Sequence, residues 1–400
     1  MSKHANDAIR WPNTWLEWPF LDDTHRKLAS ELDNWCQQRL QSVDESDVNA
    51  ACRDLVCAMG QAGWLRYCVP AGSNGQWGGA LPRLDSRSLC IIRETLARHH
   101  ALADFAFAMQ GLGSGAISLA GTDAQRQTYL SAVASGQKIS AFALSEPDAG
   151  SDVAALSCSA QKDGNTYVIN GYKTWISNGG IADFYCVFAR TDAEAGSRGI
   201  SAFIVDANTP GLFIDEVIDV ISPHPLAKLR FDNCRVPADQ MLGPLNEGFK
   251  LAMRTLDIFR TSVAAAAVGF ARRAVQEGLQ YASQRKMFGQ TLADFQLTQA
   301  AFGDMATAID QSALLTYRAA WVRDVQQRAP TMETAMAKMA ATESAQQVID
   351  RTMQMFGGRG VVRASPLERL YRDIRSLRIY EGATEVQKLI ISREMLRSRL

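Results

Sequence analysis

The sequence predicts a mostly α-helical protein of the α+β class, in which a middle antiparallel β-barrel-like domain lies between an N-terminal α-helical domain and a C-terminal four-helix bundle. Three patterns predict this order. Apolar residues recur with helical spacing up to about residue 138, alternate with polar residues from about 139, and return to helical spacing from about 247. We therefore expect domains at residues 1–138, 139–246 and 247–400, and 400 residues are enough to give them cores.

The N-terminal domain is expected to contain helices joined by loops rich in glycine and proline, of which residues 69–82 are the plainest. Residues 111–115, G-L-G-S-G, carry the glycines of a phosphate-binding loop. They follow no predicted strand and lie among alanines with helical spacing, so close packing of two helices is the favoured interpretation. The expected helices are residues 22–41, 47–62 and 86–99.

The middle domain is expected to begin with two successive hairpins. The pairs Asp163-Gly164 and Asn170-Gly171 supply the positive backbone angles that tight turns require. They separate short segments rich in β-branched and aromatic residues, which is typical of strands. The expected strands are residues 157–162, 166–169, 172–177, 184–190, 200–207, 212–217 and 226–236.

Helical spacing in the C-terminal domain predicts long helices that pack together. Apolar residues from Phe249 to Val263 fall on one face, and the small residues 264–267 allow another helix to approach closely. Residues 297–327 and 332–356 have few helix breakers. Such helices form a bundle, which commonly holds a site in its core or buries one face against a partner subunit.

Composition excludes several classes of function. Lys plus Arg equals Asp plus Glu at 42 each, so no excess charge attracts nucleic acid or an anionic surface. The first ten residues lack an apolar run and no stretch approaches 18 apolar residues, so we expect a cytoplasmic protein without a membrane span. The eight cysteines show no C-x-x-C spacing and the five histidines no H-x-x-x-H pair, which favours buried reduced thiols and no metal site.

The stretch from Arg372 to Gln387 contains the candidate catalytic residue, Glu381. A glycine directly after it, Gly382, lets the backbone approach a ligand closely and places little bulk beside the carboxylate. An isolated E-G pair is more often a solvated glutamate before a helix, here with Thr384 and Glu385 in the first turn. The choice depends on the other motifs of the chain.

Five motifs in order resemble the acyl-CoA dehydrogenase family of flavoproteins over nearly the whole chain. The last of them is the stretch around Glu381, R-D-I-R-S-L-R-I-Y-E-G-A-T-E-V-Q. The resemblance implies an FAD-dependent enzyme. The other four motifs are F-A-L-S-E-P-D-A-G-S-D at 142–152, K-T-W-I-S-N-G at 173–179, R-K-M-F-G through Gln296 at 285–296, and Q-M-F-G-G-R-G at 354–360.

The resemblance also implies a set of FAD-binding residues. Trp175 offers a flat face beside the flavin and Arg285 a planar fork for a diphosphate; alone, they would read as a core aromatic and a solvated helix charge. Arg285 and residues 354–358 match family positions that reach the FAD of a neighbouring subunit, which implies a homotetramer built as a dimer of dimers. The full set is Phe142, Leu144, Ser145, Ser151, Trp175, Ser177, Arg285, Phe288, Gln296, Gln354, Gly357, Gly358, Thr384 and Glu385.

For the substrate, an acyl-CoA thioester, the resemblance implies contacts from Ser151, Asp257, Arg260, Glu381 and Gly382. An ion pair within the bundle is an equally good interpretation of Asp257 and Arg260, because an arginine in an apolar helix needs a partner.

The reaction implied is α,β-dehydrogenation to the 2-enoyl-CoA. Glu381 would take the α-proton, flavin N5 would accept the β-hydrogen as hydride, and an electron-transfer flavoprotein would take the electrons. In the family, a flavin ribityl hydroxyl and the backbone N–H of the base stabilise the enolate oxygen. One branch of the family keeps its base on the first bundle helix, where this chain has Phe259. Of the two family positions for the base, Glu381 is therefore the only one that carries a candidate.

Some residues depart from the family pattern. Ala383 and Ser177 stand where threonine is common, and residues 69–80 replace a more charged loop. Counting back from Gln110, the arginine that binds a carboxylate in glutaryl-type relatives falls on Asp104. This disfavours a dicarboxylate substrate and admits an amine-bearing or hydroxylated acyl group, although an acid on a helix surface is the favoured interpretation of Asp104.

Three other functions stay open on this scaffold. An oxidase acting on acyl-CoA or on a carrier-protein thioester would pass electrons to oxygen, a lyase would form product without net flavin reduction, and a scaffold subunit would be catalytically silent. The presence of Glu381, Trp175 and Arg285 together argues against the last. The sequence does not identify the acyl chain.

Overall fold

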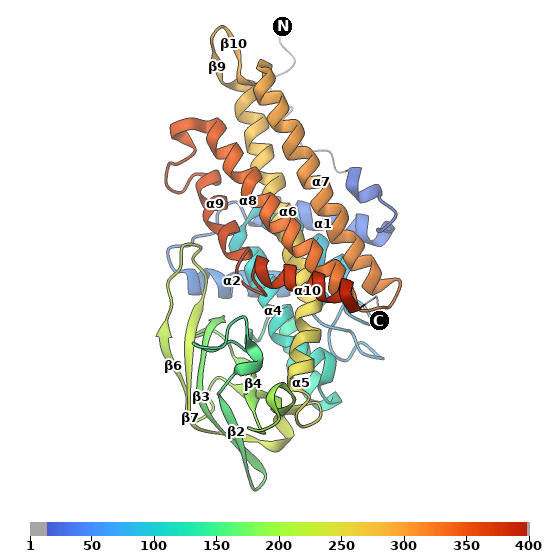
Figure 1. Cartoon of the computed structure of the whole chain (residues 1–400), viewed down its shortest axis with the longest axis vertical. Coiled ribbons are helices and arrows are strands. Elements are labelled where there is room, and N and C mark those ends of the chain that lie inside the picture. The colour runs from blue at the N-terminus through green and yellow to red at the C-terminus, as the bar shows by residue number, and fades with distance from the viewer. Residues whose placement is uncertain (1–13, 398–400) are drawn as a thin grey trace. The chain divides into compact units, whose positions relative to one another are not determined.

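The computed structural model describes residues 14–397 and has the predicted mostly helical architecture (Figure 1). The α-helices are α1 (Asp23–Arg39), α2 (Val48–Gln61), α3 (Ser86–His99), α4 (Ala101–Ala120), α5 (Asp123–Ala134), α6 (Gly248–Gln284), α7 (Gln296–Asp324), α8 (Thr331–Phe356), α9 (Pro366–Leu377) and α10 (Thr384–Arg397). The strands are β1 (Ser140–Ala143), β2 (Ser159–Asp163), β3 (Thr166–Ser177), β4 (Phe184–Arg190), β5 (Ile200–Asp206), β6 (Leu212–Val217), β7 (Leu226–Pro237), β8 (Met241–Leu242), β9 (Lys286–Met287) and β10 (Gln290–Thr291).

Contacts divide the chain into two compact units. The helical unit holds the described residues of Met1–Gln41, Ser86–Ala101 and Arg260–Leu400. The sheet unit holds Ser42–Asp85 and Leu102–Phe259, so the division falls inside α6.

In the helical unit, α8 packs against α7, α9 and α10, and α7 and α8 run side by side (Figure 1). The short helix α9 shows why these segments fold as they do. Ser365 caps its N-terminus, Pro366 occupies its first turn, and its buried residues are Leu367, Leu370, Ile374 and Leu377. One apolar stripe therefore faces the bundle, and the chain leaves α9 just before Glu381.

The sheet unit contains one sheet with strand order β6-β7-β3-β2-β4-β5-β8, in which β1 pairs with β4. Most pairs are antiparallel, but β1 and β4 are parallel. The hairpin predicted at Asp163-Gly164 is confirmed, because β2 and β3 pair from Asp163 opposite Thr166.

The second predicted hairpin, at Asn170-Gly171, is wrong. β3 continues through both residues and pairs with β7 on either side of a register shift there. Gly171 has a φ of 134°, and a Cβ added to it would lie 2.8 Å from the Cα of Cys158. The glycine therefore allows a bulge rather than a turn, since pairing with β7 extends the strand past the local signal.

The glycine run of α4 packs against the start of α6, as the sequence predicts. A Cβ on Gly111 would lie 2.5 Å from the ring of Phe259, and one on Gly115 would lie 2.8 Å from Thr255. These glycines let the two helices approach closely. The same packing buries Phe259 at 2 % exposure, in the sheet unit.

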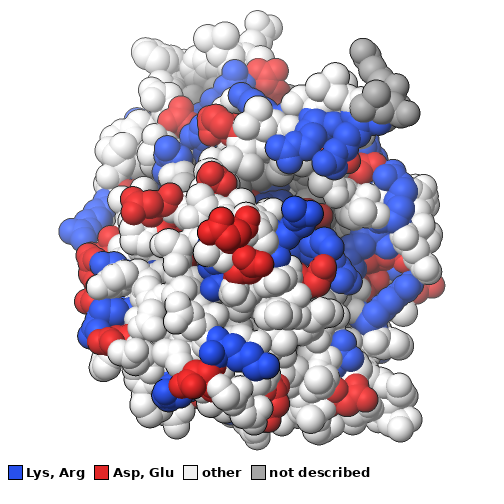
Figure 2. Space-filling view, turned by 60° about the horizontal axis from the view of Figure 1, so that its bottom comes forward, with Lys and Arg blue, Asp and Glu red and all other residues white. Residues whose placement is uncertain are grey.

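The cysteines are free and mostly buried, as predicted, with Cys57 exposed. Side chains of both charge signs lie on the face drawn in Figure 2. Among residues 14–397, no helix is both long enough and apolar enough to cross a bilayer.

Candidate functional site

The loop that carries Glu381 has an unusual backbone. It joins α9 to α10, and Glu381 and Gly382 have φ angles of 53° and 93°. A non-glycine residue in this region carries a strain on the order of 1–3 kcal/mol and persists only where its surroundings hold it. Gly382 needs to be glycine, because a Cβ there would lie 2.5 Å from Nε2 of Gln387.

Three side chains of the helical unit hold this loop through its carbonyl oxygens. Arg260 Nε donates to the Glu381 carbonyl at 2.8 Å, and Lys338 Nζ donates to the Gly382 carbonyl at 2.8 Å. Gln387 Nε2 also donates to the Gly382 carbonyl at 2.8 Å. Lys338 and Gln387 are both fully buried. The strained backbone of the predicted base is therefore fixed from α6, α8 and α10.

Charged side chains around the loop affect the pKa of Lys338. Burial lowers the pKa of Lys338 from its ordinary 10.5 to about 8, because the ammonium loses hydration. The carboxylate of Glu381 opposes this shift and the guanidinium of Arg260 adds to it. Lys338 therefore remains mostly protonated at neutral pH, next to the predicted base.

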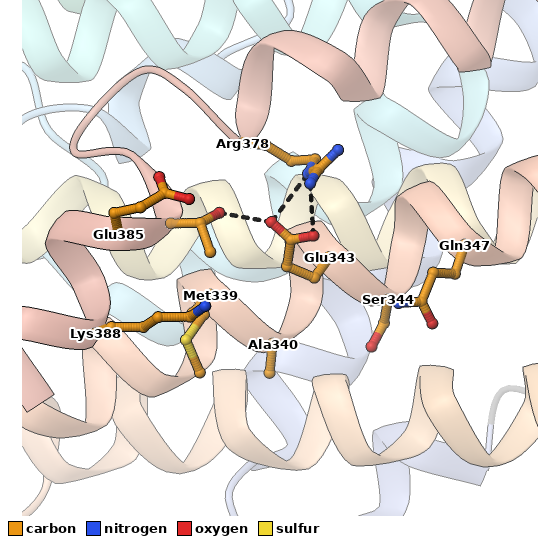
Figure 3. Close-up of a pocket in the computed structure, with 9 residues that line it drawn as sticks. Met339, Ala340, Glu343, Ser344, Gln347, Arg378, Glu385 and Lys388 are labelled. Carbon is orange, nitrogen blue, oxygen red and sulfur yellow. Dashed lines mark hydrogen bonds and ion pairs between the residues drawn. The ribbon is translucent and has the colours of Figure 1, made fainter.

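A surface cavity of about 390 Å³ lies beside this loop, between α8, α9 and α10 (Figure 3). In it, Arg378 Nη2 pairs with Glu343 at 2.8 Å and the Thr384 hydroxyl donates to Glu343 at 2.6 Å. Burial acts to raise the pKa of Glu343, but these two partners lower it below its usual value. The predicted cofactor residue Thr384 is thus bonded to Glu343, while its neighbour Glu385 is exposed and lines the cavity.

Other predicted cofactor residues of the helical unit lie on its surface. The rings of Tyr281 on α6 and Phe356 on α8 stack at 4.1 Å, which brings the ends of these two helices together. Arg285 follows the first helix end, and Gly357 and Gly358 follow the second. The members exposed to solvent are Arg285, Phe288, Gln296, Gln354, Gly357 and Gly358.

In the sheet unit, Trp175 is the most conspicuous predicted site residue. Its φ is 57° and its side chain is 59 % exposed, at a register shift between Lys173 and Ile176 in the pairing of β3 with β7. In a regular strand, successive side chains alternate between the two faces of the sheet. The register shift interrupts this alternation, and the large aromatic ring of Trp175 points toward solvent. An exposed indole of this kind suits a stacking partner.

A buried ion pair fixes the backbone next to Trp175. Lys173 Nζ donates to the Leu144 carbonyl at 2.9 Å and to Glu146 Oε1 at 2.7 Å, and Thr174 N–H donates to the Ser145 carbonyl at 2.9 Å. Burial acts to raise the pKa of Glu146, but Lys173 lowers it below its ordinary value. The segment of Leu144 and Ser145 is therefore held rigidly against β3.

The remaining predicted residues of the sheet unit are placed separately. Phe142 packs on Phe188, with ring centroids 4.9 Å apart, and Ser177 ends β3 half-buried. Ser151 is exposed and Asp257 half-buried. The preferred interpretation of Asp104 as a surface acid is wrong, because its residue is only 3 % exposed on α4.

Four residues that support the site were not predicted from the sequence: Lys173, Glu146, Lys338 and Gln387. Each is buried, and each fixes a backbone segment that holds a predicted site residue. A lysine inside an otherwise apolar segment, as in A-M-A-K-M-A-A, was the available signal, because a buried ammonium needs a partner.

Each unit has surface features that suit a part of FAD. Exposed Trp175 offers a stacking face, and the segment of Leu144 and Ser145 offers backbone groups beside it. In the helical unit, a Cβ on Gly357 or Gly358 would meet no described atom within 4 Å, so open space lies over both glycines near the cationic Arg285. This suits a flat ring system in one unit and a diphosphate in the other.

Family models match most of the chain. They are the acyl-CoA dehydrogenase N-terminal domain at residues 22–137, the middle domain at 141–234 and the C-terminal domain at 246–396.

Curated relatives match nearly the full length. The mitochondrial short-chain specific acyl-CoA dehydrogenase of Homo sapiens is 38 % identical over 94 % of this chain and 91 % of its own. The 3-(aryl)acrylate reductase of Clostridium sporogenes is 36 % identical over 94 % of this chain and 100 % of its own. The caffeyl-CoA reductase-Etf complex subunit CarC of Acetobacterium woodii is 35 % identical over 94 % of this chain and 96 % of its own.

Solved structures agree. Butyryl-CoA dehydrogenase from Megasphaera elsdenii has a TM-score of 0.85 at 30 % identity and covers 94 % of this chain and 99 % of its own. A glutaryl-CoA dehydrogenase from Mycobacterium smegmatis in complex with FADH2 has a TM-score of 0.84 at 26 % identity and covers 94 % of this chain and 95 % of its own. The chain therefore belongs to the acyl-CoA dehydrogenase family of FAD-dependent oxidoreductases.

Proposed function

We propose that the protein catalyses α,β-dehydrogenation of an acyl-CoA thioester to the 2-enoyl-CoA, with Glu381 as the base. The observation that carries the proposal is the loop at Glu381, whose strained backbone is fixed by Arg260, Lys338 and Gln387. Such fixing suits a carboxylate that must meet one C–H bond in one geometry. FAD, when bound, supplies the two-electron oxidant.

Each residue of the proposed site then has its own role in the reaction. Glu381 accepts the α-proton on its carboxylate, and its backbone N–H donates to the thioester oxygen, where negative charge develops. Arg260 holds the carbonyl of the same residue, which restrains the loop that carries that N–H. Arg260 and Gly382 would contact the substrate beside the base, and Ser151 and Asp257 are assigned to substrate contacts from the sheet unit.

We assign FAD to two groups of residues. Phe142, Leu144, Ser145, Ser151, Trp175 and Ser177 would hold the flavin end, and the exposed indole of Trp175 supports this. Thr384 and Glu385 complete the assignment beside the base. Arg285, Phe288, Gln296, Gln354, Gly357 and Gly358 would hold the diphosphate end, in a homotetramer built as a dimer of dimers; their exposure supports a shared site.

The electron acceptor is proposed to be an electron-transfer flavoprotein. Support comes from the name of the CarC relative, a subunit of a reductase-Etf complex. Two relatives are named as reductases, which favours the reverse reaction as a second candidate: Glu381 would then return the proton to the α-carbon of an enoyl thioester.

The test is a substrate panel on the purified yellow protein. Straight, branched, aromatic and amino-substituted acyl-CoA thioesters are mixed anaerobically with the oxidised enzyme, and loss of flavin absorbance is followed. The proposal predicts bleaching by at least one saturated thioester and formation of its enoyl product. Product without bleaching would indicate a lyase, peroxide without added acceptor an oxidase, and a protein that binds no FAD would contradict the proposal.

A further inference from the structure

We propose that Lys338 is a positioning residue of the reaction: its ammonium fixes the Gly382 carbonyl in the loop of the base, and its positive charge favours the ionised form of the Glu381 carboxylate. This inference rests on the proposed role of Glu381 as the base. Lys338 itself does not touch the reacting atoms in the proposal, since its hydrogen bond is made to the loop backbone.

The surroundings of Lys338 make a cation costly there. Lys338 lies on α8 with an exposure of 0 %, and Ala335, Ala337 and Ala341 of the same helix are buried as well. An ammonium loses its hydration in such a place, and a neutral side chain of similar size would avoid that loss.

The hydrogen bond alone does not account for the lysine. The carbonyl of Gly382 accepts one hydrogen bond from Lys338 at 2.8 Å and another from Gln387 at 2.8 Å. Without Lys338 this partly buried carbonyl would still have a donor, so folding does not require a cation at this position. What the lysine adds is a positive charge directly against the loop of the base.

That charge acts on Glu381. The groups that face Lys338 are Glu381 from the loop, Arg260 from α6, Glu343 from α8 and Glu385 from α10. Among the three carboxylates, Glu381 interacts with it most strongly. A neighbouring cation favours the ionised form of a carboxylate, so Lys338 keeps the base deprotonated at lower pH than it would otherwise be. A base must be ionised to accept the α-proton.

The experiment isolates proton removal from electron transfer. 3-Thiabutyryl-CoA and 3-thiaoctanoyl-CoA have sulfur in place of the β-carbon, so the base can remove their α-proton but no β-hydrogen can leave. Exchange of the α-protons with D2O is measured by mass spectrometry on the FAD-loaded enzyme between pH 5 and 9. Ligand affinity is measured on the same samples from the change in flavin absorbance.

Five variants separate the possible roles. Lys338→Met removes both donor and charge, Lys338→Gln removes the charge alone, and Lys338→Arg keeps both. Lys27→Met is the control, an exposed lysine on α1 in the same unit and away from the loop of the base in sequence. Glu381→Gln tests the base itself.

We expect Lys338→Met to slow exchange at least tenfold with ligand affinity changed less than threefold, and to move the acid limb of the pH profile upward by about one unit. Lys338→Gln should move the acid limb by a similar amount, and Lys338→Arg should keep it near the wild-type position. Lys27→Met should match wild type in both exchange rate and acid limb. Since a buried charge is removed, Lys338→Met should not melt below wild type at pH 7.

The inference is overturned if Lys338→Met exchanges the α-protons at the wild-type rate and the acid limb of its pH profile stays at the wild-type position. A lower melting temperature accompanied by normal exchange per folded molecule also overturns it, because that pattern marks a merely structural lysine. If Lys338→Met does not fold, an unmoved acid limb in Lys338→Gln overturns it equally. Wild-type exchange by Glu381→Gln would instead overturn the proposed base.

Discussion

Arg260 donates its Nε hydrogen to the carbonyl oxygen of Glu381 at 2.8 Å, so a guanidinium on α6 holds the backbone of the predicted base. Arg260 is 8 % exposed, and charge-assisted hydrogen bonds of this kind contribute about 1.5–3 kcal/mol.

We expect Arg260→Gln to slow flavin reduction by about ten- to a hundredfold at saturating substrate, because the loop loses its orientation. Arg254→Gln, an exposed arginine on the same helix, is the control. Equal reduction rates for both variants and the wild type would mean that this hydrogen bond does not orient the base.

The buried pair of Lys173 and Glu146 should be essential to the sheet unit. Their side chains are 0 % and 4 % exposed, and Lys173→Met leaves the Glu146 carboxylate without its cation. We expect a loss of about 3–5 kcal/mol in unfolding free energy, measured in denaturant, together with weaker FAD binding. The exposed pair of Arg235 and Asp163 provides the comparison: Arg235→Met should cost about 1 kcal/mol or less. Similar losses in both variants would contradict the account.

Lys338 should also give stability a particular dependence on pH. Its pKa is about 8 when folded and 10.5 ordinarily, so the folded state binds fewer protons between these values and stability rises with pH across that window. The difference amounts to about 3 kcal/mol. Lys338→Met should therefore exceed wild type in unfolding free energy at pH 7.5, and the excess should shrink by pH 10. An excess that does not change with pH would show that the lysine pKa is not depressed.

Arg285→Ala should loosen FAD and the oligomer together. The guanidinium is exposed in the single chain, and in the proposed shared site it would pair with a diphosphate. The measurements are the dissociation constant for FAD and the molar mass by light scattering. A variant that keeps both FAD affinity and the wild-type mass would leave Arg285 as a surface charge.

Much of the fold could be predicted because local signals agree with the packing. The predicted helix 86–99 matches α3 at both ends, and the glycines of α4 pack on α6 as expected. The hairpin predicted at Asn170-Gly171 is absent because pairing with β7 overrides a strong local turn signal. No local sequence pattern reveals that pairing.

The supports of the site could not be predicted in the same way. Lys173 and Lys338 are single lysines in apolar segments, and only their burial and their carbonyl partners show what they hold. Asp104 was misjudged because a helical pattern alone does not tell which face is covered. Glu381 was found from its motif, but its positive φ and the donors around it come from tertiary structure.

The central claim is that Glu381 removes the α-proton. Glu381→Gln keeps the size of the side chain and most of its hydrogen-bonding shape, so the variant should fold, bind FAD and bind acyl-CoA. Anaerobic stopped-flow reduction of the flavin at saturating substrate is the direct measurement. We expect a rate at least about a thousandfold below wild type; equal rates for wild type and Glu381→Gln would contradict the role of Glu381 as the base.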